Sequence, residues 1–483
     1  MSLQAWVFVA YFVVVFAIGW LSMLRTRDET DYWIAGGTLG WFTGGATLAA
    51  THVSAGTFVG TVGIIYTAGW SFGWVLVSIP LAYWFVAAVV APRFTRVRQL
   101  TLPAFMEARY YSKGVRGIAA AVALVATVVY IQAQIVAGGL VANIVFGVPE
   151  AWGMVAFTAI LLAYTVIGGM IAVVWTDTFQ LVIMVLGAVL ALPLAVRQVG
   201  GPSSLLVLVE SARPTVFQWG NLPSSLLFTM GLAFFLGSIA TPEKLTRLYS
   251  MKDLPTIRRG VFFATVCITG LNLMVFLVGL CAVVLFPGLP SGDMAMPLVA
   301  TAVLTPLLGA LMLAAITSAM MSTVSSLLIV AGSALSVDLY QNLMDPGASR
   351  GRRRWVDRLG IVVVGSVPVL LLLSGVGKGE LVQLIVLLFT ALMASSFAVP
   401  VVGGVFWRRA TKEGAAAGMV GGIAAAFLWQ AFGPESVHAV VPGFLTSLLL
   451  WWGVSLVTPP PPPEAVAPYF PSAEPEPRPG VRP

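Results

Sequence analysis

The sequence predicts an all-α polytopic membrane protein with about 13 transmembrane helices. Its composition is the first reason: 59% of the 483 residues are hydrophobic and only 9% are charged, whereas roughly 25% of the residues in an average soluble domain are charged. The mean hydropathy of +0.95 is the second. The third is the recurrence, along nearly the whole chain, of apolar stretches of about 20 residues, the length needed to cross a hydrocarbon core of roughly 30 Å.

The apolar stretches define thirteen expected spans within one transmembrane domain, residues 1–457. Boundaries read from a single sequence are good to a few residues. The spans are expected at residues 3–24, 40–65, 70–92, 117–143, 150–168, 171–197, 223–241, 259–287, 297–337, 359–376, 381–407, 414–433 and 438–457. At Thr458 the composition changes to a run of five prolines followed by further Pro and Glu. Residues 458–483 are therefore interpreted as a disordered Pro-rich cytoplasmic tail.

The basic residues of the loops predict the orientation in the membrane. With the N-terminus placed outside, the inward loops hold 21 of the 26 Lys and Arg residues, among them Lys244 and Arg247, while the outward loops hold only Arg197, Arg213 and Lys378. Cytoplasmic loops of polytopic proteins carry such an excess of positive charge. The sequence therefore predicts a multi-pass protein of the plasma (inner) membrane with a cytoplasmic C-terminus. The net charge of +7 reflects this bias and contact with the lipid bilayer, and not nucleic-acid binding.

Other classes of protein find little support. The two histidines, His52 and His438, fall on different spans and no His-Glu-x-x-His motif exists, so an intramembrane enzyme is not expected. The sequence has no selectivity-filter motif and no ring-like charge pattern, so a channel is not expected. A sensor is not expected either, since it would need an appended signalling domain. Cys267 and Cys281 lie on one span without a Cys-x-x-Cys pattern and are interpreted as packing residues. No obligate protein partner is evident.

The spans form two tandem units of five, spans 2–6 and 7–11, with span 1 and spans 12–13 at the periphery. Because five is odd, the second unit is inverted in the membrane relative to the first. The opening span of each unit is interrupted, at residues 50–56 and at residues 235–242. Interruptions at corresponding positions of two halves are the best sequence pointer to a midplane binding site in inverted-repeat transporters. The alternative is that membrane helices simply tolerate Gly and Pro.

Asp177 is the only acidic residue that we place inside the membrane. It lies eight residues beyond Gly169 at the inner end of the sixth span, which at 1.5 Å per residue is about 12 Å deep. An intramembrane carboxylate is costly to bury and is a functional-site hypothesis by default. We expect no Lys or Arg at that depth, so the carboxylate must be protonated or bind a cation.

The ninth span carries a dense face of hydroxyl groups. Four hydroxyl side chains share an arc of about 160° at 100° per residue. They belong to Ser322, Thr323, Ser325 and Ser326. Sodium is a hard cation that prefers oxygen ligands, and a broken second span would add free carbonyl oxygens at Ala50 and Val53. The alternative is that the hydroxyls only let helices pack closely or bond to their own backbone.

Three motifs resemble the signatures of the sodium/solute symporter family, and the match runs in order over about residues 5–457. The motifs are Tyr164-Thr-Val-Ile-Gly-Gly-Met-Ile-Ala-Val-Val-Trp-Thr-Asp-Thr-Phe-Gln180, Ala319-Met-Met-Ser-Thr-Val-Ser-Ser326 and Pro400-Val-Val-Gly-Gly-Val-Phe-Trp-Arg-Arg-Ala-Thr-Lys-Glu-Gly-Ala416. The resemblance implies a thirteen-helix fold with a core of five plus five inverted helices. It also implies uptake of a small solute driven by the sodium gradient.

Carried over residue by residue, the resemblance implies sodium as the bound ion and two sets of ligands. The principal sodium site would use carbonyl oxygens of Ala50, Val53 and Ala319 and hydroxyl oxygens of Ser322 and Thr323. Members with a second sodium build its site from residues that stand here at Asp177, Ser325 and Ser326, sharing Ser322. All of these are present, so the resemblance allows a two-sodium stoichiometry.

The segment from His52 to Gly60 resembles the pantothenate-permease branch more than the proline branch. The solute cavity should be lined by Thr51, His52, Ser54, Thr57, Phe234, Phe235, Ser238, Thr390, Ser395 and Ser396. Because His52 lies between two proposed carbonyl ligands, its ring should lie near the midplane site, where as a neutral hydrogen-bond donor it would favour a carboxylate-bearing solute. The alternative is a neutral histidine that bonds to a neighbouring helix. The expected function is sodium-coupled symport, by alternating access, of a small pantothenate- or monocarboxylate-like solute. The alternatives are a proton- or sodium-coupled carrier of an amino acid or sugar and, more remotely, a channel or sensor.

Overall fold

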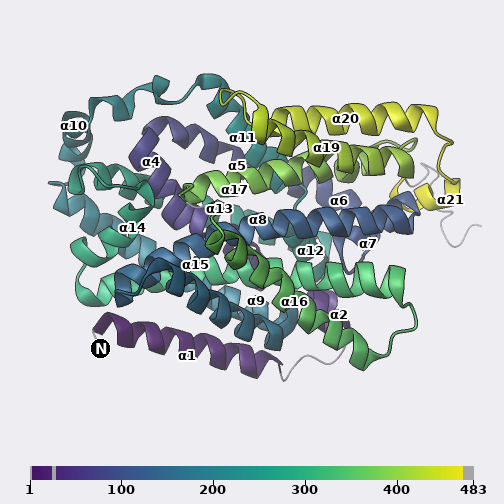
Figure 1. Ribbon diagram of the computed structural model, residues 1–483, viewed down its shortest axis with the longest axis horizontal. Coiled ribbons are helices and arrows are strands. Elements are labelled where there is room, and N and C mark those ends of the chain that lie inside the picture. The colour runs from purple at the N-terminus through teal and green to yellow at the C-terminus, as the bar shows by residue number, and fades with distance from the viewer. Residues whose placement is uncertain (1–2, 24–28, 378, 471–483) are drawn as a thin grey trace, which may run out of the picture.

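The computed structural model describes residues 3–23, 29–377 and 379–470. Apart from one isolated bridge between Leu39 and Met251, these residues form helices and their connections. Within these described ranges, ten helices are long and apolar enough to cross a membrane, and the bent pair Trp41–His52 and Gly56–Ala68 makes an eleventh. Most of the long helices run along the long axis of the molecule (Figure 1). The expected all-α polytopic fold class is confirmed.

Each of the thirteen expected spans coincides with a helix, part of a helix or a pair of helices. In chain order these are α1 (Leu3–Met23), α3 (Trp41–His52) with α4 (Val62–Ala68), α5 (Gly73–Phe85) with α6 (Ala91–Phe94), α8 (Lys113–Phe146), the two parts of α9 (Glu150–Gln198), α11 (Ser224–Ser238) with α12 (Pro242–Ser250), α13 (Leu254–Leu285), α15 (Pro306–Ser333), α16 (Arg350–Leu373), α17 (Val382–Met393) with α18 (Gly404–Phe406), α19 (Lys412–Phe432) and α20 (Val440–Val457).

The ninth span begins later than expected. Residues 297–303 belong to α14 (Ala295–Leu298) and a π-helical turn, and α15 begins only at Pro306. The reason is local: the residue before a proline avoids the helical region, whereas proline itself is favoured in the first turn of a helix. Thr305 is accordingly non-helical, with φ −59° and ψ 155°.

Several spans contain π-helical turns. One follows the break in the second span, at Gly56–Thr61, and another forms the inner half of the eleventh span, at Ala394–Gly403. A π turn inserts residues into the helical repeat, so the side chains that follow it point to a different face than an α-helix would give them. These turns matter below because they change which residues face the solute cavity.

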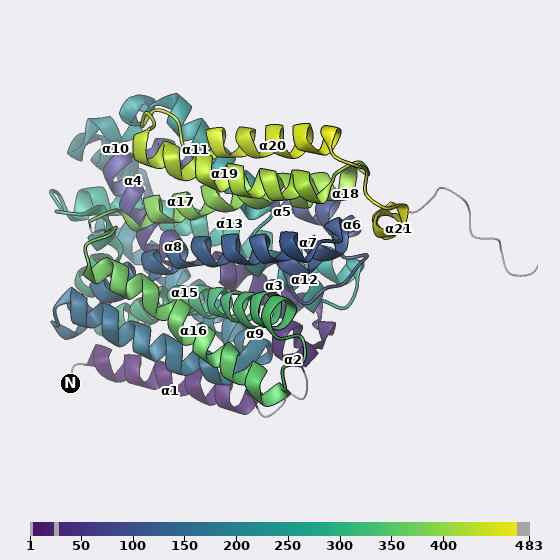
Figure 2. The ribbon, with the colours of Figure 1, turned by 45° about the vertical axis from the view of Figure 1, so that its right-hand side comes forward.

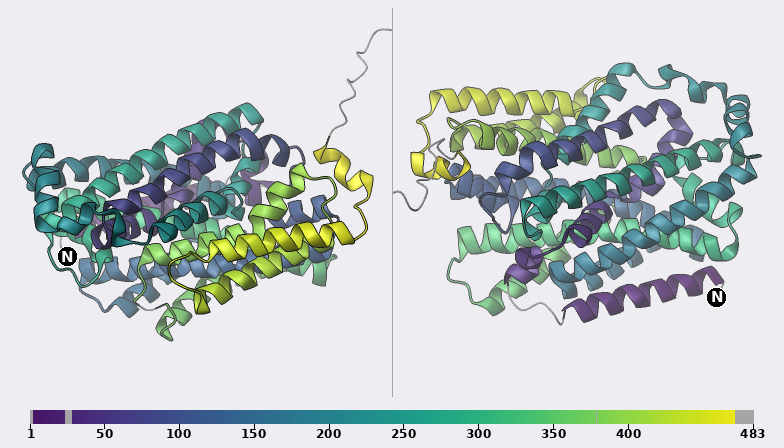
Figure 3. Two further views of the ribbon diagram at one scale, coloured as in Figure 1. Left: turned by 90° about the horizontal axis from the view of Figure 1, so that it is seen from above. Right: turned by 180° about the vertical axis from the view of Figure 1, so that it is seen from behind.

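The first and the last two spans lie at opposite edges of the molecule. Helix α1 packs against α9 and α15, while α19 and α20 pack on each other and on Ala394–Gly403. Figures 1 and 2 show α1 at one edge and α19 and α20 at the other, and the view from behind in Figure 3 agrees. The helices of spans 2–11 fill the space between them.

The first part of the tail has regular structure, contrary to the expected disorder from Thr458. Pro463–Val466 form the short helix α21. Tyr469 is 2% exposed, its ring lies 5.8 Å from that of Phe105, and its carbonyl accepts from Nη1 of Arg96 at 3.2 Å. The prolines shape a connection that returns to the helices, where the aromatic side chain of Phe105 packs on Tyr469. Residues 471–483 lie outside the described part.

Candidate functional site

The second span is broken at its centre. Helix α3 ends at His52, Val53 is extended with φ −71° and ψ 113°, and the chain resumes as a π-helical turn at Gly56. The amide of Ala55, inside the break, donates to Oε1 of Gln134 on α8 at 2.9 Å. The last carbonyl groups of α3 therefore have no partner from a following helical turn.

These carbonyl groups meet the hydroxyl face of α15. Oγ of Ser322 donates to the carbonyl oxygen of Ala50 at 2.8 Å and lies 3.2 Å from that of Ala319. Oγ1 of Thr323 lies 3.3 Å from the carbonyl oxygen of Val53 and 3.0 Å from that of Ala319. All five residues are fully buried. The structure thus brings together the whole set expected for the principal sodium site.

The chemistry of this oxygen cluster fits a sodium ion. Carbonyl and hydroxyl oxygens are hard, neutral ligands, and a hydroxyl that now donates can rotate to present a lone pair instead. Within the described part of the chain, no group of three or more His, Cys, Asp or Glu side chains could hold a metal. Because the ligands of the cluster itself are neutral, they suit a monovalent cation better than a more highly charged metal.

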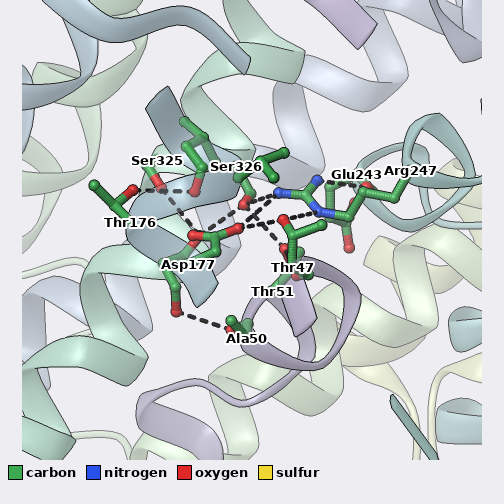
Figure 4. A network of polar contacts seen from close by, with 12 residues as sticks. Thr47, Ala50, Thr51, Thr176, Asp177, Glu243, Arg247, Ser325 and Ser326 are labelled. Carbon is green, nitrogen blue, oxygen red and sulfur yellow. Dashed lines mark hydrogen bonds and ion pairs between the residues drawn. The ribbon is translucent and has the colours of Figure 1, made fainter. Parts of the chain in front are cut away.

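Asp177 lies close to this cluster, on α9, and is fully buried. Its Oδ2 accepts a hydrogen bond of 2.6 Å from Oγ1 of Thr47, one turn before Thr51 on α3 (Figure 4). Its Oδ1 has no hydrogen-bond partner among the described residues. Oγ of Thr51 in turn lies 3.1 Å from Oγ of Ser326. The carboxylate and the hydroxyl face are therefore linked through α3.

The expectation that Asp177 has no basic partner is wrong. Nη2 of Arg247 lies 3.3 Å from Oδ2 of Asp177, and both side chains are fully buried. The same Nη2 donates to Oγ of Ser326, and Nε donates to Oγ1 of Thr47 at 3.1 Å. Figure 4 shows the guanidinium between these groups.

Arg247 reaches this depth because the seventh span continues after its break. The chain turns at Thr241 and restarts as α12 with Pro242 in its first turn, and all nine residues of α12 are buried. The charge count assumed that Lys244 and Arg247 are loop residues. Both lie instead on the buried helix α12. Asp177 is also not the only acidic residue in the membrane part, because Glu243 on α12 is 1% exposed. The sequence of α12 is polar, so hydropathy alone ends the span at Pro242.

Ser325 and Ser326 differ in their contacts. Oγ of Ser326 donates to the carbonyl of Ser322 at 2.7 Å while it also meets Arg247. Oγ of Ser325 lies 3.1 Å from the same carbonyl. Of the residues expected at a second sodium site, Asp177 and Ser326 thus share an arginine.

A cavity lies on the other side of the broken helix, within the described residues. Its lining consists of His52, Ser54, Gly56, Thr57, Thr61, Leu76, Ile79, Tyr130, Phe234, Lys244, Asn272, Gln383, Val386, Phe389 and Thr390. The rings of Tyr130 and Phe389 stack at 4.3 Å. Five of the ten residues expected at the solute cavity are among these lining residues. They are His52, Ser54, Thr57, Phe234 and Thr390.

The other five expected residues lie elsewhere. Thr51 faces the cation cluster, where it meets Ser326, and Phe235 packs on Phe85 with ring centroids 5.8 Å apart. Ser238 lies behind Lys244, whose Nζ is 3.4 Å from its hydroxyl.

Ser395 and its neighbour Ser396 are also absent from the lining. Ser395 faces α19 and α20, where the closest approaches are to Gly422 and Gly443. Both serines lie in the π-helical segment Ala394–Gly403. The register shift of this segment turns them to a different face than a continuous α-helix from Thr390 would give them.

The sequence did not identify five polar lining residues: Thr61, Tyr130, Lys244, Asn272 and Gln383. Gln383 stands in the first turn of α17, and its Oε1 is buried without a partner among the described residues. A Cβ on Gly60 would lie 2.8 Å from this oxygen, so a glycine is needed there. Lys244 carried one available signal, its position two residues after the Thr-Pro break of the seventh span.

A protein-family model and several known relatives match most of the chain. A model of the sodium:solute symporter family matches residues 32–422. The sodium/pantothenate symporter of Escherichia coli (strain K12) is 30% identical over 460 residues, covering 91% of this chain and 94% of that protein. The high-affinity proline transporter PutP of Bacillus subtilis (strain 168) is 28% identical over 453 residues, covering 91% of this chain and 95% of that protein. Relatives therefore include both branches considered from the sequence.

Solved structures share the fold. The substrate-bound, outward-open state of a Na+-coupled sialic acid symporter superposes with a TM-score of 0.83 at 21% identity, covering 95% of this chain and 99% of that one. The nucleobase-cation-symport-1 family transporter MHP1, in a closed conformation, gives a TM-score of 0.59 at 14% identity, covering 92% and 97%. At these identities the likeness establishes the architecture.

Proposed function

The chain belongs to the sodium:solute symporter family, and from this membership we propose that it is a secondary active transporter of the plasma membrane. It couples sodium to the uptake of a small organic solute that bears a carboxylate. Sodium binds at the cluster of Ala50, Val53, Ala319, Ser322 and Thr323, and the solute binds in the neighbouring cavity. The N-terminus lies outside and the C-terminus in the cytoplasm.

Lys244 is the observation that carries the class of solute. Its side chain lines the cavity and is only 8% exposed. Its one hydrogen bond among the described residues is a long contact of 3.4 Å to Ser238. The buried carboxylate of Glu243 on the same helix offsets part of this charge electrostatically. An ammonium group whose one hydrogen bond among the described residues is so long still gains from an anion that binds it directly. A solute carboxylate in the cavity supplies that anion.

The rest of the lining supports a carboxylate without a free amine. His52 contributes a ring whose Nδ1 has no partner among the described residues, and Gln383 contributes an amide. No Asp or Glu is among the lining residues, so an ammonium group on the solute would meet no carboxylate in the lining itself. Tyr130 and Phe389 offer aromatic surface for an apolar part. These features favour a pantothenate- or monocarboxylate-like solute over an amino acid such as proline.

The broken segment of the second span gives a physical basis for coupling. The carbonyl groups of Ala50 and Val53 face the cation cluster, while the side chains of His52, Ser54 and Thr57 face the cavity. An ion that holds these carbonyls also orders the side chains between them. Solute binding to the ordered segment then costs less conformational entropy, which is positive coupling between the two sites.

A thermal-shift screen of the purified protein tests the proposal. Carboxylates, amino acids and sugars are compared in sodium and in choline, because a ligand that binds the folded state raises its stability by mass action. We expect stabilisation by one or more amine-free carboxylates, in sodium only. Uptake of the best ligand into proteoliposomes should then require an inward sodium gradient.

The variant Lys244→Gln separates the solute class from general binding. It should weaken the affinity for the best carboxylate by about tenfold or more, since a hydrogen bond to a charged group contributes about 1.5–3 kcal/mol, while stabilisation by sodium alone persists. Lys252→Gln, on an exposed inner loop, is the matched control and should behave as wild type. Binding of uncharged sugars, or full affinity in Lys244→Gln, would contradict the carboxylate assignment.

A further inference from the structure

A fully buried ion pair joins two spans beside the oxygen cluster of the proposed sodium site. Asp177 on α9 and Arg247 on α12 are both 0% exposed. Burying such a pair is costly unless the remaining hydrogen-bonding groups are satisfied. The surroundings of the guanidinium meet this condition.

Every nitrogen of the Arg247 guanidinium has a partner. Nε donates to Oγ1 of Thr47 at 3.1 Å, Nη1 donates to the carbonyl of Glu243 at 2.8 Å, and Nη2 meets Asp177 and Ser326 (Figure 4). Two of these groups, Asp177 and Ser326, are those from which the resemblance builds a second sodium site. The positive charge of Arg247 therefore already contacts two of the four residues of that set.

We propose that the guanidinium of Arg247 is the resident cation of the Asp177–Ser326 site, so that this protein binds one sodium ion and not two. The inference rests on the proposed sodium-coupled function. A sodium ion at Asp177 would have to lie beside a permanently charged arginine, whether it bound the shared Oδ2 or the free Oδ1. Like charges in so buried a place repel each other strongly. Arg247 cannot leave easily, because α12 is buried along its whole length.

The main competing interpretation is that the pair only stabilises the contact between α9 and α12. The two interpretations differ in what happens when the arginine is removed. A resident cation leaves behind a carboxylate and hydroxyls suited to sodium, whereas a purely structural pair leaves only a destabilised contact. Counting bound sodium ions distinguishes them.

The experiment is equilibrium binding of radioactive sodium to the purified full-length protein, titrated to saturation with choline as the replacing cation. Wild type should bind one sodium ion per chain. Arg247→Gln should bind two, because sodium then compensates Asp177. The double variant Arg247→Gln with Asp177→Asn should return to one. Sodium should also raise the unfolding temperature of Arg247→Gln more than that of wild type.

Two control variants match this design. Arg247→Lys keeps a positive charge at the site and should keep one bound sodium. Arg116→Gln removes another arginine that pairs with a fully buried aspartate, Asp338, at 2.7 Å. That pair lies apart from the serines of α15, so its loss should leave the count at one.

The outcomes separate this inference from the proposed function. Two sodium ions in wild type, or one in a folded Arg247→Gln variant, would overturn the inference alone. A wild-type count of zero would overturn the proposed sodium coupling and this inference with it. If Arg247→Gln does not fold, Asp177→Asn decides: a count that stays at one supports the inference, and a fall from two to one overturns it.

Discussion

Ser322 and Thr323 each contribute one hydroxyl oxygen to a cluster of five residues. Replacing either by Ala removes one oxygen from a small coordination shell. We expect the sodium concentration for half-maximal binding to rise about tenfold or more, because a contact to a charged group contributes about 1.5–3 kcal/mol. Sodium titrations of thermal stability or solute binding measure this shift.

Ser333→Ala is the matched control for these two variants. Ser333 is buried on the same helix, but its hydroxyl bonds only to the carbonyl of Val330 at 2.8 Å. Its replacement should leave the sodium dependence unchanged. If Ser322→Ala and Thr323→Ala behaved like this control, the cluster would not be the sodium site.

Asp293 gives a prediction about pH. It lies between the eighth and ninth spans and is 5% exposed. Burial raises the pKa of Asp293 to about 6, although the amide of Val382 donates to its Oδ2 at 2.9 Å. The ordinary pKa of Asp in an unfolded chain is about 3.9. Between these values the folded protein binds more protons, so this group's contribution to stability is full below about pH 4 and is lost as pH rises through about 6.

Asp293→Asn should remove this pH dependence while keeping an acceptor for the Val382 amide. Wild type should gain stability from pH 7 to pH 4, by up to about 3 kcal/mol from this group, and the difference between wild type and variant reports it. Thermal unfolding in detergent across this range is the measurement. Glu435→Gln, at an exposed carboxylate, is the control. A variant that follows wild type at every pH would contradict this assignment.

At the scale of single residues, the sequence predicted the cation cluster better than the cavity. Ser322 and Thr323 lie on a continuous helix whose spacing fixes their common face, and Ala50 and Val53 flank a recognisable break. Arg247 was missed because its burial depends on the helices that cover α12, which no local pattern records. Ser395 was misplaced because a π turn depends on tertiary packing.

At the scale of helices, the broken helix is held by a close backbone contact. A Cβ on Gly45 of α3 would lie 2.5 Å from the carbonyl oxygen of Gly260 on α13. Gly45→Ala should therefore force the two helices apart and lower stability by about 1–3 kcal/mol. Small residues serve this purpose widely in membrane helix packing. The unfolding temperature in detergent is the measurement.

Gly270→Ala, on α13 itself, is the control for this contact. Nothing lies within 4 Å of a Cβ added there, so alanine should be neutral or stabilise the helix by about 0.5–1 kcal/mol. Equal effects of the two substitutions would mean that the contact between α3 and α13 is looser than the structure shows.

The positions of the long helices were predictable because hydropathy reports them directly. The positions of α12, α14 and α21 were not, since these helices are short and gain their stability from neighbours.

At the scale of the whole molecule, the orientation rests on the loop charges and is open to a direct test. Ser203→Cys, exposed on an expected outer loop, should react with a membrane-impermeant thiol reagent in intact cells. Lys113→Cys, exposed at the start of α8, should react only after permeabilisation. Wild type is the background control, because Cys281 is buried and Cys267 is half-buried. The reverse labelling pattern would invert the topology.

The inverted architecture was predictable for a physical reason. An odd number of spans in each unit and the alternation of loop charge constrain the topology strongly, and both are properties of the sequence alone. The packing of α1 against α9 and α15 followed only from the structure. Lipid-facing and protein-facing helices are both apolar, so hydropathy does not tell them apart.

The arginine held at Asp177 also has an electrical consequence. A carrier that moves one sodium ion with one monocarboxylate moves no net charge, because the two charges cancel. Arg247 stays in the protein and takes the place of a second sodium ion that would add a charge. The membrane potential, which contributes about 2.3 kcal/mol per elementary charge at 100 mV, would then do no work on transport. A tenfold sodium gradient, about 1.4 kcal/mol, would support at most about tenfold accumulation. The ratio of internal to external solute would then be limited by the sodium gradient alone. A cell could depolarise without losing the solute that it has taken up.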